Sequence, residues 1–218
     1  KYANFVITFS EYKKSLLKKK FKVKNFKDIY NFFPKNFVER RERNKMNIYF
    51  VGRFVDSKNP IFFLNKTIKL LEKKNIRIHM IGKGILKKQL KSISQKFSKD
   101  VKIIPHTSNP IIKFKKRIDI FCVTSKYDGT PNVLGEAVSC NIPCLAPKNI
   151  GLTNTLLLNG KGGYLYKPNN SLDFRKNLNK ILTNYNQALT KSKIAFNKLD
   201  RFDKQNTLQK ISKIIADL

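Results

Sequence analysis

Acidic residues, cysteine and tryptophan are scarce in this sequence. Its 218 residues include 14 Asp and Glu, three Cys and no Trp. The cysteines, Cys122, Cys140 and Cys144, are odd in number and lack the paired spacing of a zinc site, and no histidine stands near the last two. We therefore expect no metal site, no cofactor held by thiols and no disulfide framework, but reduced thiols of the kind that cytosolic proteins carry.

Long apolar runs are absent as well. No stretch approaches the roughly 20 apolar residues that a helix needs to cross a bilayer. The start, with Glu11 and many lysines, does not have the pattern of a signal peptide. Hydrophobic residues still make up 41% of the chain, which is enough for the core of one α/β domain with a short extra segment. Because the first residue is Lys1 rather than Met, we expect the chain to begin inside a longer reading frame or to follow processing.

Basic residues are abundant, and 46 Lys and Arg give the chain a formal net charge of +32. Such a charge attracts nucleic acid or an anionic membrane surface. It also follows from an AT-rich coding sequence, because 38 of the basic residues are Lys and Asn occurs 23 times. A protein that reads bases favours Arg, whose planar guanidinium makes bidentate contacts. We therefore favour composition as the main cause, keep an anionic membrane surface as the second, and expect no specific nucleic-acid partner.

Short apolar runs alternate with helical patterns from Met46 onward. We expect helices over Pro60–Glu72 and Ile85–Phe97, and more from Ser171 to Leu218. This alternation predicts an α/β fold in which helices cover both faces of a parallel sheet. Ligands of such sheets bind beyond the carboxyl ends of the strands. The expected strands are Asn47–Val51, Ile76–Ile81, Val101–Ile104, Ile118–Val123 and Ile142–Ala146.

The first 45 residues have a different pattern. They form a small βαβ unit that is too short to be a domain. We expect residues 1–45 to be a remnant of another domain with its linker, and residues 46–218 to form the main domain with its C-terminal helices. The expected elements of the remnant are a strand over Phe5–Phe9, a basic helix over Glu11–Lys20 capped by Ser10, and a strand over Asn25–Tyr30.

Gly52, Arg53 and Lys58 follow the first strand of the main domain. A glycine there lets the backbone approach a ligand closely, and the two cations could hold a diphosphate at the carboxyl edge of the sheet. A solvated basic loop also explains these residues. It is the better explanation of this motif on its own, because lone basic pairs are commonly surface groups.

The next strand ends in a turn that contains Gly82 and Gly84. Backbone amides at such a helix start can meet an anion. A tight turn that merely requires glycine is an equally good explanation.

The strongest pattern follows the fourth expected strand. A loop carries Asp128 and Gly129, Thr130 can cap a helix, and Pro131 suits the first turn, where its missing N–H costs nothing. Two carboxylates in a chain with so few acids make an incidental origin the weaker explanation.

The helix start of this segment predicts a phosphate site. The free amides of Asn132 and Val133 would point at a bound phosphate, and the helix dipole would assist. Asp128 and Glu136 could both face the same crevice and accept hydrogen bonds from sugar hydroxyls. A phosphate clamp beside two carboxylates suits a nucleotide-diphosphate sugar.

These motifs together resemble the retaining, family-4 glycosyltransferases. Asp128–Glu136 is similar to the Glu-Gly-x-Pro-Asn-x-x-x-Glu segment of that family and differs only at its first residue. The family's Gly-Arg followed by Lys, and its Gly-x-Gly turn, correspond to the two earlier motifs. Gly162–Leu165 looks like the glycine-hydrophobic strand that follows the sugar-binding loop. The resemblance covers nearly the whole chain, with its motifs in the family's order.

The resemblance implies the donor-binding half of a GT-B fold, a Rossmann-like sheet that binds a nucleotide-diphosphate sugar. Arg53 and Lys58 would neutralise the diphosphate as the glycosidic bond breaks, Glu136 would hold the ribose hydroxyls, and Asp128 the transferred sugar. The departing phosphate would take the proton of a glycan or lipid-linked acceptor at the cytoplasmic face of the membrane, without a cofactor. The other donor-binding residues would be Gly52, Gly82, Gly84, Gly129, Pro131, Asn132 and Val133.

The sequence departs from the family's pattern in three ways. Asp128 replaces Glu and reaches roughly 1.5 Å less, and 149–153 stands where the family has a glycine pair followed by an acid. The acceptor domain, which supplies acceptor contacts, is almost entirely absent. We interpret His79 as structural and His106 as at most a neighbour of the nucleotide.

Three functional hypotheses follow. The first is a glycosyltransferase whose donor half is this chain. The second is a sugar-nucleotide-binding module without catalysis, and the third is a basic nucleic-acid-binding protein. The third lacks interleaved aromatic and basic motifs and arginine enrichment.

Overall fold

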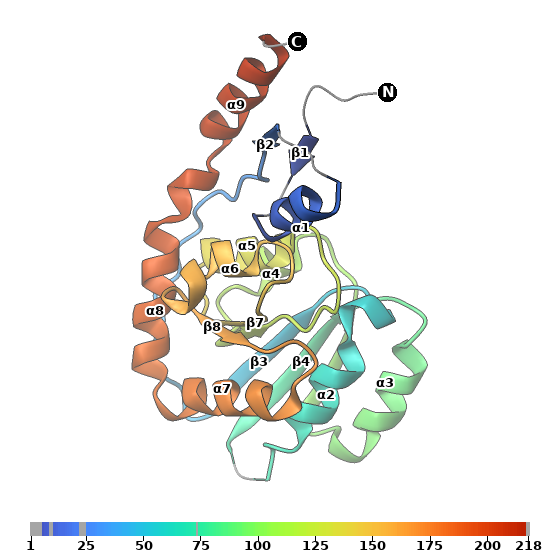
Figure 1. Cartoon of the computed structure of the whole chain (residues 1–218). Coiled ribbons are helices and arrows are strands. Elements are labelled where there is room, and N and C mark those ends of the chain that lie inside the picture. Colours follow the sequence, from blue (N-terminus) through green and yellow to red (C-terminus); the bar gives the residue numbers. More distant parts are fainter. Residues whose placement is uncertain (1–5, 9–10, 22–24, 73, 217–218) are drawn as a thin grey trace.

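A six-stranded parallel sheet forms the centre of the computed structural model, which describes residues 6–8, 11–21, 25–72 and 74–216 (Figure 1). The strand order is β5-β4-β3-β6-β7-β8. Counted from the first strand of the sheet, this is the order 3-2-1-4-5-6 of Rossmann sheets, and it confirms the predicted fold class. The strands are β3 (Met46–Val51), β4 (Ile76–Gly82), β5 (Val101–Pro105), β6 (Ile120–Cys122), β7 (Cys144–Pro147) and β8 (Tyr164–Tyr166).

Helices cover both faces of this sheet, and each face has its own apolar core. On one face Phe63, Leu90 and Phe174 are fully buried; they come from α2 (Pro60–Ile68), α3 (Lys87–Ser94) and α7 (Ser171–Thr183). The other face packs against α4, α5 and α6 (Figure 1). The remaining bounds are α4 (Pro110–Phe114), α5 (Asn132–Ser139), α6 (Thr153–Leu156), α8 (Tyr185–Asn197) and α9 (Lys204–Ala216).

Two predicted helices are shorter than expected. The helix predicted over Pro60–Glu72 ends at Ile68, and turns complete the segment. The helix predicted over Ile85–Phe97 is α3 followed by a 3-10 turn over Gln95–Phe97. Within the described residues, no helix combines the length and the apolar character that crossing a bilayer requires.

The N-terminal βαβ unit is present as predicted. β1 (Val6–Thr8) and β2 (Phe26–Asp28) pair in parallel, with α1 (Glu11–Phe21) between them. Thr8 Oγ1 donates to Asp28 Oδ1 at 2.7 Å, and Lys14 Nζ lies 2.8 Å from the other oxygen of that carboxylate. The expected cap Ser10 and the outer residues of the first strand, Phe5 and Phe9, lie outside the described residues.

The linker, residues 29–45, lies along the main domain. Phe33 is buried in its core, and the Phe33 amide donates to the carbonyl of Phe202 at 3.0 Å. The Asn36 amide donates to the carbonyl of Ser139, at the end of α5, at 2.8 Å. The linker is therefore fixed to the helices of the main domain along much of its length.

Arg40 makes the densest polar contact of the linker. Its guanidinium donates to the carbonyls of Asn141, Lys115 and Cys140 at 2.8, 2.8 and 3.2 Å, and also to that of Ile118. These carbonyls come from the ends of α4 and α5 and from the approach to β6, where helix ends leave acceptors without partners. One side chain thus satisfies carbonyls from three neighbouring segments.

Candidate functional site

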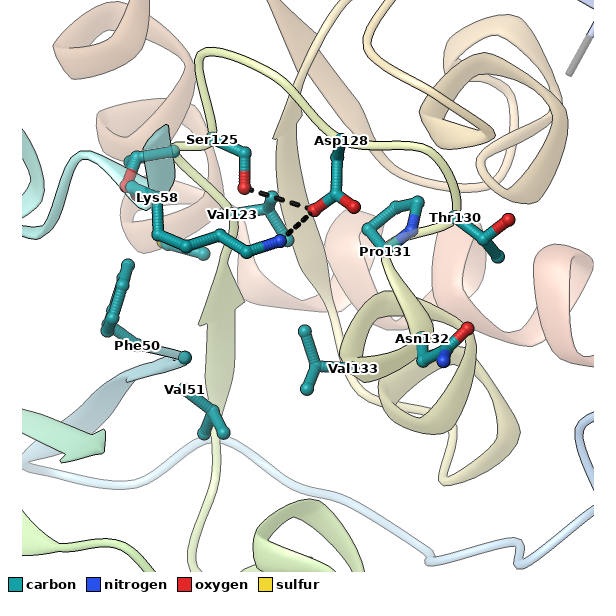
Figure 2. A pocket seen from close by; sticks show the side chains of 13 residues that line it. Phe50, Val51, Lys58, Val123, Ser125, Asp128, Thr130, Pro131, Asn132 and Val133 are labelled. Atoms are coloured by element: carbon teal, nitrogen blue, oxygen red, sulfur yellow. Dashed lines mark hydrogen bonds and ion pairs between the residues drawn. The ribbon is translucent and has the colours of Figure 1, made fainter. Parts of the chain in front are cut away.

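A cavity opens at the carboxyl ends of β3 and β6, where the strand order reverses (Figure 2). Its walls are the last residues of β3, the residues that follow β6, and the first residues of α5. Open α/β sheets bind ligands at such a switch point, because the loops of the two strands diverge to opposite faces. The fold therefore places the predicted motifs at the expected end of the sheet.

Lys58 and Asp128 form an ion pair inside this cavity. Their side chains are 23% and 11% exposed, so the pair is largely shielded from solvent. Ser125 Oγ donates to the same Asp128 oxygen at 3.3 Å (Figure 2). The sequence did not single out Ser125; its place directly after a buried strand was the only signal available.

Local structure holds Lys58 in place. The residue ends a 3-10 turn, η1 (Asp56–Lys58), and Asn59 follows in the left-handed region at φ 53°. Thr124 Oγ1 donates to the carbonyls of Lys58 and Asn59, both at 3.1 Å. Because Thr124 lies two residues after the end of β6, these bonds tie the loops after β3 and β6 together next to Lys58.

A second, more open cavity of about 610 Å³ adjoins the first and shares Lys58 and Asp128. Arg53, Gly129 and the 149–151 segment line it. The Arg53 side chain is exposed, so its cation stands at the mouth while Lys58 stands further in. The volume lies within the range of small-molecule sites. The structure thus brings both cations to one groove, and their contact with a diphosphate stays a prediction.

The start of α5 differs from the prediction in two details. The helix begins at Asn132, its N-cap position is Pro131, and no side chain caps it, so Thr130 is not the cap. The Asn132 amide is not free, because it donates to the carbonyl of Thr130 at 2.9 Å. Val133 is the second helical residue, where an amide has no acceptor within the helix. Its N–H is the amide that α5 offers to an anion at the cavity wall.

Glu136 does not share a cavity with Asp128, in contrast to the expectation of one crevice. It lies one turn into α5 and lines a third cavity, whose other wall is the linker segment 31–36. Asn132 lines both cavities, and Asn31 Nδ2 donates to Asn132 Oδ1 at 2.7 Å. No local pattern in the sequence indicates this arrangement, because Asn31 stands 101 positions before its partner Asn132.

The Glu136 carboxylate is partly unsatisfied. Its Oε2 atom is buried and has no hydrogen-bond partner among the described residues. Burial raises the pKa of Glu136 above its ordinary value of 4.5. An unsatisfied carboxylate oxygen of this kind is suited to accept hydrogen bonds from a ligand.

We expect Glu136→Gln to stabilise the chain at pH 7.5 by about 1 kcal/mol, because a neutral group replaces a buried carboxylate that lacks a partner. The folded state holds the Glu136 proton more tightly than the unfolded state does. Its stability therefore falls as pH rises from 4.5 through the raised pKa. Urea unfolding at pH 4 and pH 7.5 measures the effect, with the exposed Glu72→Gln as control. A gain of equal size at both pH values would contradict this account.

Gly82 and Gly84 do not line the two cavities around Lys58. A Cβ on Gly82 would overlap the carbonyl oxygen of Gly52, and one on Gly84, at φ +150°, would overlap the backbone of Phe54. The Leu86 amide donates to the Phe54 carbonyl at 3.0 Å, and α3 begins only at Lys87. Close packing of two backbones accounts for both glycines, and their predicted contact with the donor remains a prediction.

Neither histidine lines the two cavities around Lys58. His79 is in the middle of β4, where its ring stacks on Tyr49 with 4.4 Å between centroids, and His106 is exposed in the loop after β5. No group of three or more His, Cys, Asp or Glu side chains with metal-binding geometry occurs in the part of the chain that the structure describes. All three cysteines are buried with free thiols.

Residues 32–198 match the family described as Glycosyl transferases group 1. The chain belongs to this family. The match includes the cavity at the switch point, the ion pair and α5.

Two relatives and one solved structure show how much of such a protein is present. An uncharacterized glycosyltransferase of Haemophilus influenzae is 28% identical over 199 residues, which cover 87% of this chain and 55% of the relative. The capsular polysaccharide biosynthesis glycosyltransferase CapH of Staphylococcus aureus is 30% identical over 132 residues, or 57% of this chain and 37% of CapH. The chain thus spans about half the length, or less, of these relatives.

The structure is also similar to Anabaena HepE in complex with UDP, with a TM-score of 0.85 and 19% identity over 100% of this chain and 65% of HepE. This likeness concerns the fold. It agrees with the predicted donor half of a GT-B fold and with the parallel sheet described above.

Proposed function

We propose that this chain is the donor half of a retaining glycosyltransferase. It would transfer a hexose from a nucleotide-diphosphate sugar to a glycan or lipid-linked acceptor in the synthesis of cell-surface polysaccharide or glycoconjugate. The observation that carries the proposal is the shielded Lys58–Asp128 pair at the switch point of the sheet, between two adjoining cavities. The capsular role of CapH supports the acceptor class.

Different residues of the site contact different parts of the donor. The diphosphate lies against Lys58 and Arg53, with the Val133 amide and the positive end of α5 beside it. The nucleoside continues past Asn132 toward Glu136, whose unsatisfied oxygen accepts from the ribose hydroxyls. The transferred sugar occupies the open cavity, where Asp128 accepts from its hydroxyls.

The reaction breaks the bond between the anomeric carbon and the diphosphate oxygen. Negative charge develops on that oxygen, and Lys58 and Arg53 neutralise it, which is the electrostatic contribution that usually dominates such steps. The acceptor hydroxyl attacks the anomeric carbon and gives its proton to the departing phosphate. The protein supplies position and charge, and no protein base is required.

We expect one nucleotide diphosphate to raise the melting temperature of the chain selectively in a thermal-shift panel of UDP, GDP, ADP and their common sugars. At a ligand concentration of about 100 Kd the gain is roughly 2.7 kcal/mol, or roughly 2–4 °C for each kcal/mol in a chain of this size. UDP is the first choice because it is the nucleotide in the HepE complex.

The shift should shrink in Glu136→Gln and persist in Glu72→Gln, each measured against the melting temperature of the same variant without ligand. A folded sample that responds to no nucleotide would overturn the proposal. Binding without transfer by the full-length protein would favour the non-catalytic module instead.

A further inference from the structure

The sheet carries a polar region on the face that packs against α4. Parallel sheets are buried on both faces, so the sequences of their strands are normally continuous apolar runs. Here the second residue of each of three neighbouring strands is polar, namely Asn47 of β3, Arg77 of β4 and Lys102 of β5. The register pairs Asn47 with Arg77, and His79 with Lys102, so these side chains share one face.

This region is hollow because α4 is short. The helix has five residues and ends at Phe114, which packs against the ring of Tyr49. Beyond it lies an open cavity of about 580 Å³. About 13 Å of strand separate Asn47 from Val51 in the donor cavity, at 3.3 Å per residue. On β3 the two cavities lie toward opposite ends of the strand, while the open cavity also reaches Ile104 and Pro105 at the end of β5.

Cations surround this basic cavity, which we define by Arg77, Lys102 and Arg117 above a floor of Tyr49 and His79. Among the described residues, no carboxylate lies within ion-pair distance of these three cations. The arginines are notable because the chain has only 8. Unpaired guanidinium groups on one hollow are the usual partners of phosphate oxygens.

Asp119, which is bonded to two residues that line the cavity, is already engaged. Asp119 accepts from the backbone and side-chain amides of Asn47 at 2.8 and 3.0 Å, and Arg43 Nε lies 3.3 Å from its other oxygen. Arg43, the fourth cation that lines the cavity, is therefore paired, whereas the other three cations have no carboxylate partner among the described residues.

The floor of the cavity consists of two stacked, neutral rings. The His79 and Tyr49 rings stack at an interplanar angle of 13°, and His79 Nε2–H donates to Asn47 Oδ1 at 3.1 Å. Burial first, and then the charges of Arg77, Lys102 and Arg117, together lower the pKa of His79 to about 4. The imidazole is thus uncharged at neutral pH and sits in the field of the three cations.

We propose that the basic cavity is a second ligand site, which binds a phosphate or diphosphate group between Arg77, Arg117 and Lys102. The aromatic floor and Phe114 offer an apolar surface to the organic part of the ligand. This site is independent of the proposed donor site, because it shares no residue with the two cavities around Lys58. The source of the phosphate group is a soluble metabolite or a lipid headgroup.

The test is an NMR titration of the chain, with labelled histidine, against inorganic pyrophosphate. The chain has only two histidines, so His79 reports on this cavity and His106 serves as an internal reference. We expect saturable movement of the His79 ring signals and a rise in its pKa as the anion offsets the cations. Arg77→Gln/Arg117→Gln should weaken this response at least roughly ten-fold. The exposed Lys88→Gln should not change it.

Two further arms complete the design. Lys58→Gln should leave the His79 response unchanged, which separates this site from pyrophosphate bound at the donor site. Vesicles of phosphatidylcholine with phosphatidic acid, compared with phosphatidylcholine alone, identify the source: capture that depends on Arg77 and Arg117 indicates a lipid headgroup, and its absence indicates a soluble ligand. His79 signals that stay still at saturating pyrophosphate, or equal affinity in the double variant and Lys88→Gln, overturn the proposal.

Discussion

Lys58→Gln is expected to weaken the binding of a nucleotide diphosphate by roughly ten- to a hundred-fold, which corresponds to about 1.4–2.8 kcal/mol. Two effects add. The variant loses a charge-assisted contact to the phosphates. It also leaves Asp128, which is 11% exposed and paired with Lys58, as an uncompensated anion beside the diphosphate. Titration calorimetry on the folded chain measures the change.

A double-mutant cycle separates the two effects. Asp128→Asn in the Lys58→Gln background should restore part of the affinity, because it removes the repulsion without restoring the cation. Lys69→Gln, on the surface after α2, is the control for loss of one positive charge. If Lys69→Gln costs as much affinity as Lys58→Gln, the effect comes from the general charge of the chain, and Lys58 has no special role.

Gly82→Ala should destabilise the chain by about 3 kcal/mol or more, at the upper end of what overpacking costs. The added Cβ would overlap the Gly52 carbonyl oxygen and approach the Phe54 ring to 3.0 Å. The Gly52 carbonyl cannot rotate away as a side chain could, because it is part of the backbone. The Gly52 amide also donates to the Ile81 carbonyl at 3.0 Å, which holds this peptide in place. Relief requires β3 and β4 to separate at the end that carries the donor site. Urea unfolding gives the loss.

Gly52→Ala is the matched control for this substitution. Its Cβ would meet only the Phe50 ring, at 3.5 Å, which is ordinary van der Waals contact. Its stability should stay within about 0.5 kcal/mol of the parent chain. Equal unfolding midpoints for Gly52→Ala and Gly82→Ala would show that the backbones of β3 and β4 are not packed as closely as described.

The sheet could be predicted because its strands are short apolar runs separated by helical patterns, and this information is local. All five predicted strands of the main domain occur, with ends within two residues of the expected positions. The helix over Pro60–Glu72 was overextended because Leu70 and Leu71 continue the apolar pattern into a turn. The spacing of apolar residues indicates which residues are buried, and it does not distinguish a helix from a turn. Leu70 and Leu71 are partly buried in a turn and give the same spacing as a further helical turn would.

The site could be predicted only where its geometry follows from the order of the strands in the sheet. Lys58 and Asp128 follow neighbouring strands of one sheet, so their meeting is a consequence of topology. The separate cavity of Glu136 is not, because the linker at Asn31 and Phe33 forms its wall. The basic cavity escaped prediction for a similar reason: Arg77, Lys102 and Arg117 converge through register and a short α4.

The contacts of Arg40 limit where the linker can bend. Two-lobed enzymes close over ligands by rotation about a few residues that absorb the change in backbone angles. Arg40 clamps the linker to the ends of α4 and α5, and hydrogen bonds at Asn36, Phe33 and Tyr30 hold the preceding part of the linker to the same domain. A pivot for the βαβ unit would therefore have to lie before Tyr30, close to β2. Asn31, which holds Asn132 at the tip of α5, stays on the fixed side of such a pivot, so the linker wall of the Glu136 cavity would remain with the main domain.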